Sequence, residues 1–486
     1  MRRLEYKWLV ALVYVLALFV TLLDQTITNV ALPTLARVYH AGATDVAWVA
    51  TSYLISAAVF IPISGWFGDR FGTKRTFALA LVVFTVGSLL CGIAGGIGSL
   101  VAFRVLQGSG GGLLTPVGAT MLLRAFPLAE RARASSLIII PAIVAPALGP
   151  VVGGYLVEFQ SWRWIFLLNV PLGLAGLAIA LIGLRETRTE GAGPLDLPGF
   201  ALAAAGLGSF VYGLSQVGVR GFGDRQVIAF SGIGITLLAL FVAVELRVAR
   251  PLIDVRLLRE PLFAASNIVL FFIQGGFFGV TFLLPQLLQT ERGLSPLAAG
   301  LVSFTTALGI IVGAPLAGRL YPVVGPRRLI VGGLTLAALM SLSLRVVGLT
   351  TDPWLIRVQV FVLGVAFGFV FVPLQTAGFA RISPAQTGRA NAAYSAVRQV
   401  ATSMGVALLA TVLSSRLVVY GATLGNPDTR PGALGAFHDA FTVAALLDLL
   451  GLAAALLISD RLAAKTMTRT ATDTPIVPVS SPVFVD

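Results

Sequence analysis

Long apolar stretches recur along almost the whole of this 486-residue chain, and short segments between them hold most of its charge. Each stretch is roughly 20 residues long, which as an α-helix rising 1.5 Å per residue crosses about 30 Å of hydrocarbon. Only 11% of the residues are charged, against about 25% in a soluble domain. The sequence therefore predicts an all-α polytopic membrane protein.

We predict fourteen transmembrane helices. They cover residues 8–32, 46–66, 76–97, 99–121, 135–158, 163–184, 198–217, 227–247, 262–289, 297–318, 329–349, 354–378, 391–415 and 439–460. The even number places both termini on one side. Most of the 34 Lys and Arg residues fall in segments on that side, and basic loops mark the cytoplasmic face. We therefore expect a multi-pass protein of the plasma (inner) membrane with both termini cytoplasmic. The segment after "MRRLEYK" has no small-residue cleavage site and is interpreted as a retained first span.

The composition excludes several functional classes. The net charge of +13 lies in short loops between spans, which argues against nucleic acid as a partner. With one cysteine, Cys91, and two histidines, His40 and His438, neither a disulfide within the chain nor a Cys/His metal site is expected. No G-x-S-x-G, H-E-x-x-H or P-loop motif is present. We expect no enzyme activity, no metal and no cofactor.

Two pairs of segments match at nearly constant spacing. Three identities lie 257 residues apart: Pro116/Pro373, Arg124/Arg381 and Pro127/Pro384. Three more lie 253 residues apart: Gly65/Gly318, Gly72/Gly325 and Arg75/Arg328. The alternative, chance recurrence of Gly, Pro and Arg in membrane loops, does not account for six matches in equivalent places.

The repeat predicts how the chain is divided. Residues 1–190 would form an N-terminal six-helix bundle, 191–261 two inserted helices with linkers, 262–462 a C-terminal six-helix bundle, and 463–486 a disordered cytoplasmic tail. Repeated bundles around a central site are how many secondary transporters alternate access. The sequence thus favours a transporter over a channel.

Asp24 is the only charged residue between Trp8 and Leu32. A carboxylate at membrane depth costs several kcal/mol unless it is paired, hydrated or protonated. Arg104, in the middle of the fourth stretch, cannot release its proton and needs a partner. We interpret Asp24 as a proton-coupling carboxylate in a network with Arg104, Gln25 and Asn29. The alternative is a structural polar pair that joins the first and fourth helices.

Two further observations concern buried charge. The position 257 residues after Arg104 is Phe361, so the scaffold of the repeat does not require an arginine there. Gln107 is a second candidate partner for Arg104. Asp448 interrupts the last apolar stretch, and Arg345 is a candidate partner for it.

Several motifs resemble the major facilitator superfamily, and within it the fourteen-helix drug:proton antiporter family. "LLDQTITNVALP" resembles the first-helix motif, and "LVAFRVLQGSGGG" matches the fourth-helix motif at Arg104, Gln107 and Gly108. "WRWIFLLNVPLG" and "LDLPG" are further marks of the family. The resemblance covers almost the whole chain and implies two six-helix bundles of the major facilitator fold plus two inserted helices. It also implies proton-coupled multidrug efflux, and hence antibiotic resistance.

The resemblance assigns two further motifs. "GWFGDRFGTKR" matches the loop between the second and third helices, which helps to latch the two bundles on the cytoplasmic side. Its candidate latch residues are Gly65, Asp69, Arg70, Gly72 and Arg75. Lys74 also matches the pattern, whereas Pro322 stands at the position of Asp69 in the second copy, so the latch would be one-sided. "APALGPVVGGYL" matches the antiporter motif of exporters, and static packing is the alternative for it. Its motif residues are Gly149, Pro150, Gly153 and Gly154.

Aromatic and amide side chains gather on two later stretches and suit a loose apolar cavity. The candidate cavity residues are Gln25, Asn29, Gln107, Phe271, Gln274, Phe278 and Gln375. Lipid-facing phenylalanine is the alternative for the aromatic ones. Because few carboxylates other than Asp24 lie within the predicted spans, we expect lipophilic monocations or neutral compounds as substrates. The partners expected are thus a small hydrophobic molecule, protons and the bilayer, with the protein acting as a monomer. Export of an endogenous metabolite, lipid or siderophore is an alternative function, and a membrane receptor or intramembrane enzyme is a more distant one.

Overall fold

The computed structural model describes residues 6–126, 145–146, 148–187, 195–221, 223–248, 251–383 and 386–467. Helices make up most of this part of the chain. The first half has α1 (Tyr6–Tyr39), α2 (Ala43–Phe71), α3 (Thr73–Gly92), α4 (Ile97–Ala125), the helix Leu148–Phe159, α6 (Trp164–Leu167) and α7 (Asn169–Gly183). Next come α8 (Leu197–Arg220), α9 (Arg225–Glu245) and η2 (Val255–Arg259). The second half has α10 (Pro261–Thr290), α11 (Pro296–Val324), α12 (Pro326–Ser343), η3 (Leu344–Val346), α13 (Pro353–Gly378), α14 (Thr387–Val419), η4 (Pro427–Thr429), α15 (Arg430–Ala455) and α16 (Asp460–Met467).

Twelve helices in the described ranges are long and apolar enough to cross a membrane. Helix α4 is not among the twelve although it has 29 residues, because glycine and polar residues lower its hydropathy. The helix Leu148–Phe159 is too short as described. The all-helical membrane fold is therefore confirmed, and the count of fourteen spans stays a prediction.

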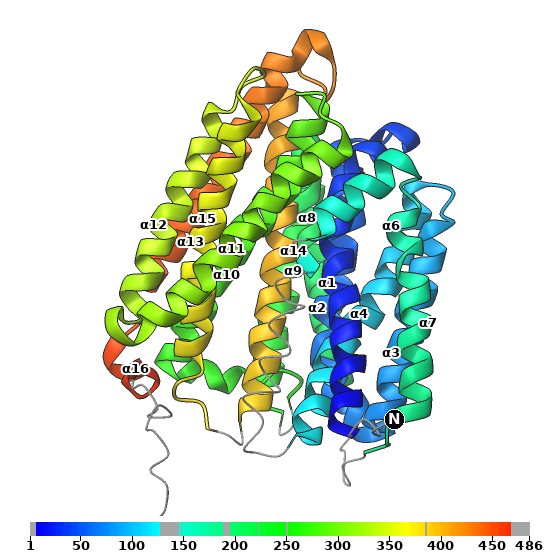
Figure 1. Cartoon of the computed structure of the whole chain (residues 1–486), viewed down its shortest axis with the longest axis vertical. Helices are drawn as coiled ribbons and strands as arrows, with labels where there is room; N and C mark the ends of the chain where they lie inside the picture. Colours follow the sequence, from blue (N-terminus) through cyan, green and yellow to red (C-terminus); the bar gives the residue numbers. More distant parts are fainter. Residues whose placement is uncertain are drawn as a thin grey trace, which may run out of the picture.

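The two halves of the chain form two groups of helices (Figure 1). Helices α1–α4, α6 and α7 form the first group, and α10–α15 form the second, in which α14 lies next to the first group. We call the end where α1 begins the near end and the end where α1 finishes the far end. Contacts between the groups run mainly from α2 to α14 and from α1 to α10.

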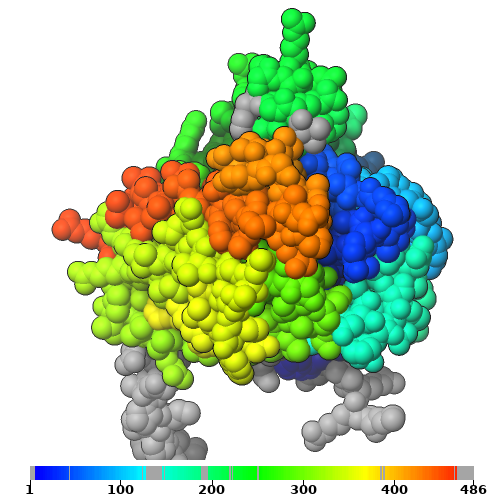
Figure 2. All heavy atoms as spheres, turned by 90° about the horizontal axis from the view of Figure 1, so that it is seen from above, coloured from blue at the N-terminus to red at the C-terminus, as the bar shows by residue number. Residues whose placement is uncertain are grey.

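Helices α8 and α9 pack on one another and form a block at one edge of the protein (Figure 2). Helix α8 of this pair lies against α2 and α14, at the seam between the groups. Leu207 of α8 packs with Ala58 and Val59 of α2 and with Val400 of α14. The Thr411 hydroxyl donates a hydrogen bond to the Leu214 carbonyl at 3.0 Å. The pair therefore covers the place where the two groups meet.

Equivalent turns in the two halves have the same backbone conformation. Gly72, between α2 and α3, has φ 94°, and Gly325, between α11 and α12, has φ 85°. Residues with a Cβ are strained in this region, which explains why glycine recurs 253 residues later. The Glu186 carboxylate accepts from the Lys74 amide at the start of α3, and the Asp460 carboxylate accepts from the Arg327 amide at the start of α12. These paired caps support an internal repeat.

Two segments differ from the sequence expectations. Helix α15 begins at Arg430 rather than at 439, because Thr429 at the N-cap and Pro431 in the first turn start the helix earlier in the chain. Helix α16 continues to Met467, although residues from 463 were expected to be disordered. The Thr466 hydroxyl lies 2.8 Å from that of Tyr321 on α11, which holds α16 against the bundle. Residues 468–486 lie outside the described ranges.

Candidate functional site

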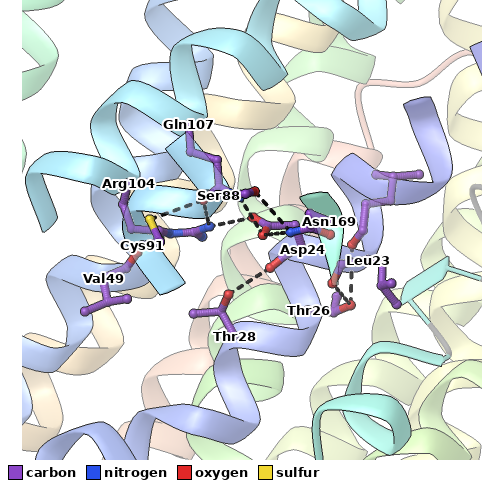
Figure 3. A network of polar contacts seen from close by, with 11 residues as sticks. Leu23, Asp24, Thr26, Thr28, Val49, Ser88, Cys91, Arg104, Gln107 and Asn169 are labelled. Carbon is purple, nitrogen blue, oxygen red and sulfur yellow. Dashed lines mark hydrogen bonds and ion pairs between the residues drawn. The ribbon is translucent and has the colours of Figure 1, made fainter. Parts of the chain in front are cut away.

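A closed polar network occupies the interior of the first helix group (Figure 3). Asp24 lies near the middle of α1. The side chains of Asp24 and of Arg104 on α4 are each at most 1% exposed. Arg104 Nη1 lies 2.5 Å from Asp24 Oδ2 and 2.7 Å from Gln107 Oε1. Its Nε donates to the Val49 carbonyl of α2 at 2.9 Å. The expected pairing of Asp24 with Arg104 is thus present in the structure.

The other carboxylate oxygen of Asp24 accepts two amide hydrogen bonds. Gln107 Nε2 and Asn169 Nδ2 each lie 2.8 Å from Asp24 Oδ1. Ser88 of α3 accepts from Gln107 at 2.5 Å and lies 3.4 Å from the amide nitrogen of Asn169. Residues of α1, α3, α4 and α7 therefore meet around one carboxylate, whose two oxygens accept three hydrogen bonds.

Aromatic rings enclose the guanidinium of Arg104. Its central carbon lies 4.3 Å from the centre of the Tyr53 ring and 5.6 Å from that of Phe166. Cation–π contacts of this kind are worth about 2 kcal/mol when they are desolvated. The network thus combines an ion pair, amide donors and ring contacts in one water-poor position.

Two expected members of the network lie elsewhere. Gln25 hydrogen-bonds to the hydroxyl of Tyr53, and Asn29 is buried. Among the described residues neither bonds to Asp24. Helix geometry explains this, because residues one and five positions after Asp24 point about 100° and 140° away from it. Asn169, Ser88 and Tyr53 complete the site instead. Only Asn169 had a signal in the sequence, since it lies within the family mark "WRWIFLLNVPLG".

The expected cavity residues of the second half do not form one cluster. Phe278 packs edge-on against Phe277, whose ring lies 4.7 Å from that of Phe367 on α13. Phe271 packs with Phe272, and Gln274 is buried. Gln375 is exposed near the end of α13. Helix α10 thus contributes aromatic rings, whereas Gln375 lies apart from them.

A second buried carboxylate, Asp448, lies inside the other helix group on α15. Ser341 of α12 donates to its Oδ2 at 2.9 Å, and no described group bonds to its Oδ1. Ser341 stands 253 residues after Ser88, so equivalent serines serve both polar centres. Arg345, offered above as a partner, lies at the far end in the surroundings of Tyr420. The second centre therefore lacks the arginine of the first.

The antiporter-motif residues lie where the two helix groups meet at the far end. A Cβ on Gly149 or Gly153 would clash with Thr26 or Ile27 of α1. A Cβ on Gly154 would lie 2.6 Å from Leu297 Cα on α11, and Gly300 of α11 faces the Pro150 carbonyl. Glycine is required here because the backbones touch.

Three hydrogen bonds join the groups at this same end. Glu158 accepts from the Leu297 amide at 2.9 Å. Gln289 Nε2 donates to the Val30 carbonyl at 2.9 Å. The Thr44 and Ser414 hydroxyls lie 3.0 Å apart. The far end is therefore closed by contacts between the halves.

The candidate latch residues lie at the near end. Asp69 lies 3.6 Å from Arg124 of α4, and both side chains are partly exposed. Arg75 lies 3.8 Å from Glu186. These contacts stay within the first helix group. Gly65 lies within α2 with open space around it, Gly72 makes the positive-φ turn, and Arg70, two residues before Gly72, is exposed.

Comparison with known proteins gives the family. A model of the Major Facilitator Superfamily matches residues 14–406. The chain belongs to this superfamily. Among curated proteins, it is 34% identical over 406 residues to the multidrug resistance protein B homolog of Mycobacterium tuberculosis (strain ATCC 25618 / H37Rv), covering 83% of this chain and 75% of that protein. It is 31% identical over 406 residues to the putative multidrug resistance protein MdtD of Salmonella heidelberg (strain SL476), covering 84% and 85%.

Solved structures share the fold. A bacterial homolog of the human lysosomal transporter Spinster, inward-facing and unoccupied, aligns with a TM-score of 0.64 at 15% identity, covering 96% of this chain and 100% of that one. The xylose transporter XylE from E. coli, partially occluded and inward open, aligns with a TM-score of 0.62 at 16% identity, covering 93% and 97%. The protein is therefore a major facilitator transporter with a multi-pass membrane fold, and both family and fold are those of transporters rather than enzymes.

Proposed function

We propose that this major facilitator protein is a proton-coupled antiporter that exports hydrophobic or amphipathic compounds by alternating access. The observation that carries the proposal is the buried Asp24–Arg104 pair, with 2.5 Å between Nη1 and Oδ2. A carboxylate beside a permanent cation can exchange a proton when the surroundings of the pair change. A purely structural pair is the alternative, and the experiment below separates the two.

The proposed cycle uses the two ends of the protein differently. We take the near end as cytoplasmic, because the basic segments lie there. In the conformation described above, the antiporter-motif glycines and the hydrogen bonds at the far end would close the site to the outside. When the site opens outward, the packing of α1 against α4 and α7 would change. Protonation of Asp24 would then remove its ion pair with Arg104. The near-end motif of Gly65, Asp69, Arg70, Gly72 and Arg75 would then serve as the latch.

The substrate class rests on the relatives and on the aromatic residues. The two curated relatives are named for multidrug resistance, which supports drug efflux. We place this efflux at the inner membrane as part of the proposal. The rings of Phe271, Phe277 and Phe278 on α10 supply apolar surface. We retain the division into bundles 1–190 and 262–462 with the insert 191–261, cytoplasmic termini and a monomeric protein as parts of the proposal. Export of an endogenous metabolite, lipid or siderophore would use the same machinery.

The test is efflux of lipophilic dyes from proteoliposomes with an imposed pH gradient. We expect wild-type efflux to follow the gradient and to stop when an ionophore collapses it. Asp24→Asn should lose gradient-driven efflux by at least about tenfold while its melting temperature shows that it is folded. Asp224→Asn is the matched control, because Asp224 caps α9 through two backbone amides and asparagine caps helices equally well.

Each outcome has one meaning. Efflux that ignores the pH gradient would exclude proton coupling. Gradient-driven efflux that survives in Asp24→Asn would leave Asp24 as a structural residue. No transport of any dye, with the pH gradient intact, would favour the alternative of an endogenous substrate.

A further inference from the structure

Arg398 lies within the span Arg389–Val419 of α14 and was not singled out by the sequence. Its side chain lies deep in the protein, yet it is only half-buried. Arginine stays charged in proteins, and a charge at membrane depth is tolerated only when it is paired or faces water. Arg398 therefore needs either an acidic partner or an aqueous passage.

No carboxylate among the described residues pairs with Arg398, and its guanidinium donates no hydrogen bond to them. The two carboxylates at membrane depth in the helix groups are engaged elsewhere. Asp24 is bound to Arg104, Gln107 and Asn169, and Asp448 is bound to Ser341. Arg398 is thus a permanent positive charge without a protein counterion in the described ranges.

Two tyrosines lie within electrostatic reach of this charge, one from each half of the protein. Tyr394 lies one turn earlier on α14, and Tyr14 comes from α1. Both rings are buried, and both interact electrostatically with Arg398. A guanidinium has only hydrogen-bond donors, and a phenol hydroxyl beside it can also donate, so together they can satisfy an oxyanion.

Apolar surface lies at a similar depth. Gly275 of α10 approaches Ala401 and Gly405 of α14, so the two helices run side by side there. Phe271 lies one turn before Gly275 on the same face of α10, which directs its ring toward α14 near the level of Arg398. Phe271 thus offers an apolar face to the body attached to the anion, whereas Phe272 beside it lies against Gly451 of α15.

We propose that Arg398, with the hydroxyls of Tyr14 and Tyr394, binds the anionic group of an amphipathic organic acid that this transporter carries. The binding group is a monovalent oxyanion such as a carboxylate, and Arg398 engages it from the side of α14 where Tyr14 of α1 interacts with it. The scarcity of carboxylates predicted cationic or neutral substrates, whereas Arg398, which has no acidic partner among the described residues, favours an anionic one. This inference rests on the proposed transport function and names its substrate class.

The experiment measures binding, which needs neither a pH gradient nor Asp24. Three fluorescent probes share one apolar group and differ in charge: dansylglycine, its neutral amide and the cationic dansylcadaverine. Each is titrated into purified full-length protein in phosphatidylcholine nanodiscs. We expect the wild type to bind dansylglycine at least about tenfold more tightly than the amide, because charge-assisted hydrogen bonds exceed neutral ones by that amount. Dansylcadaverine should bind more weakly still.

Two variants locate the preference. Arg398→Gln should bind acid and amide equally, and Arg398→Lys should keep part of the preference, because lysine retains the charge but not the planar fork. Arg416→Gln is the matched control. Arg416 lies on the same helix, 3.2 Å from Asp439 and half-exposed, and this variant should bind all three probes as the wild type does.

Probe binding to the wild-type protein can overturn the proposal without any variant. Equal binding of acid and amide, or tighter binding of the cation, would exclude an anion site even if Arg398→Gln failed to fold. Loss of the preference when phosphatidylglycerol is added would identify a lipid headgroup as the occupant and would overturn the transported acid. If the wild type prefers the acid but its efflux does not depend on the pH gradient, proton coupling would be excluded while the anion site at Arg398 would still be supported.

Discussion

Arg104 of α4 and Asp24 of α1 form an ion pair with 2.5 Å between Nη1 and Oδ2, inside one helix group and away from solvent. The pair is not isolated, because Arg104 also donates to Gln107 and to the Val49 carbonyl. Breaking a buried pair by removing one partner leaves an uncompensated charge and costs about 3–5 kcal/mol. The pair therefore couples the packing of α1, α2 and α4 to the charge state of one carboxylate.

Replacing Arg104 by lysine tests whether geometry matters as well as charge. Lysine can reach Asp24 but cannot also bond to the Val49 carbonyl through a planar fork. We expect Arg104→Lys to lower dye efflux about tenfold and to lower the melting temperature of the purified protein. Arg357→Lys is the control, because Arg357 of α13 stacks on Trp354 at 4.8 Å. Equal activity of wild type and Arg104→Lys would mean that charge alone is enough.

Replacing Asn169 by leucine removes two donors from the network while nearly preserving volume. Asp24 Oδ1 and Ser88 would each lose a partner, and an unsatisfied buried polar group costs about 1–3 kcal/mol. We expect a lower melting temperature for Asn169→Leu. Asn267→Leu is the control, since the amide of this buried α10 residue donates only to the Phe263 carbonyl of its own helix. Similar losses in both variants would show that the Asp24 network has no special role.

Adding a side chain at Gly154 tests closure of the far end. A Cβ there would meet the backbone of Leu297, so Gly154→Val should hold α11 away and keep this end open. We expect an introduced Val30→Cys, buried in the wild type, to react with a membrane-impermeant maleimide only when Gly154→Val is present. The native Cys91 is buried and should not react. Gly208→Val, which has open space around it, should leave Val30→Cys protected. Protection in both variants would contradict the closure.

Glu291 gives the protein a pH-dependent contact at the far end. Its carboxylate accepts from the Gly425 amide at 3.1 Å. Burial raises the pKa of Glu291 above its ordinary value of 4.5, although the Gly425 hydrogen bond and Arg430 oppose the shift. An acid whose pKa is raised by folding stabilises the fold below its unfolded pKa and loses that contribution as pH rises through the folded pKa.

The wild-type melting temperature should therefore fall relative to Glu291→Gln as pH rises from about 4 toward about 8. Glutamine keeps an oxygen for the Gly425 amide and does not titrate. Differential scanning fluorimetry of both proteins across this range measures the difference. A constant gap between the two curves would show that Glu291 does not titrate in this window.

The sequence was informative where a residue type is unusual in its setting. Asp24 and Arg104 stand out because charge is rare in apolar stretches, and helix spacing placed Gln107 beside Arg104. Ser88 and Tyr53 could not be found in this way, because serine and tyrosine are ordinary in membrane helices. Asn29 and Gln25 were assigned to the network by nearness in sequence, but the helix turns them away from Asp24. Pairing across helices depends on rotation and depth, which hydropathy does not encode.

Arg398 shows a different limit. It lies in "NAAYSAVRQVATSMG", where polar residues are frequent enough that one arginine resembles the end of a span. Only the described contacts place it deep in the protein without an acidic partner. The glycines of the antiporter motif were recognised from the sequence, whereas their partners on α1 and α11 required the packing of the two halves.

The central claim is that Asp24 exchanges a proton during transport. The most direct measurement is proton release on substrate binding, followed with a pH-sensitive dye in weakly buffered solutions of the purified protein. The account predicts that a transported dye stabilises the state in which Asp24 is paired with Arg104, and so releases protons from the molecules in which Asp24 is protonated, in the wild type and in Asp224→Asn but not in Asp24→Asn. Release of the same amount from Asp24→Asn, with dye binding unchanged, would contradict it.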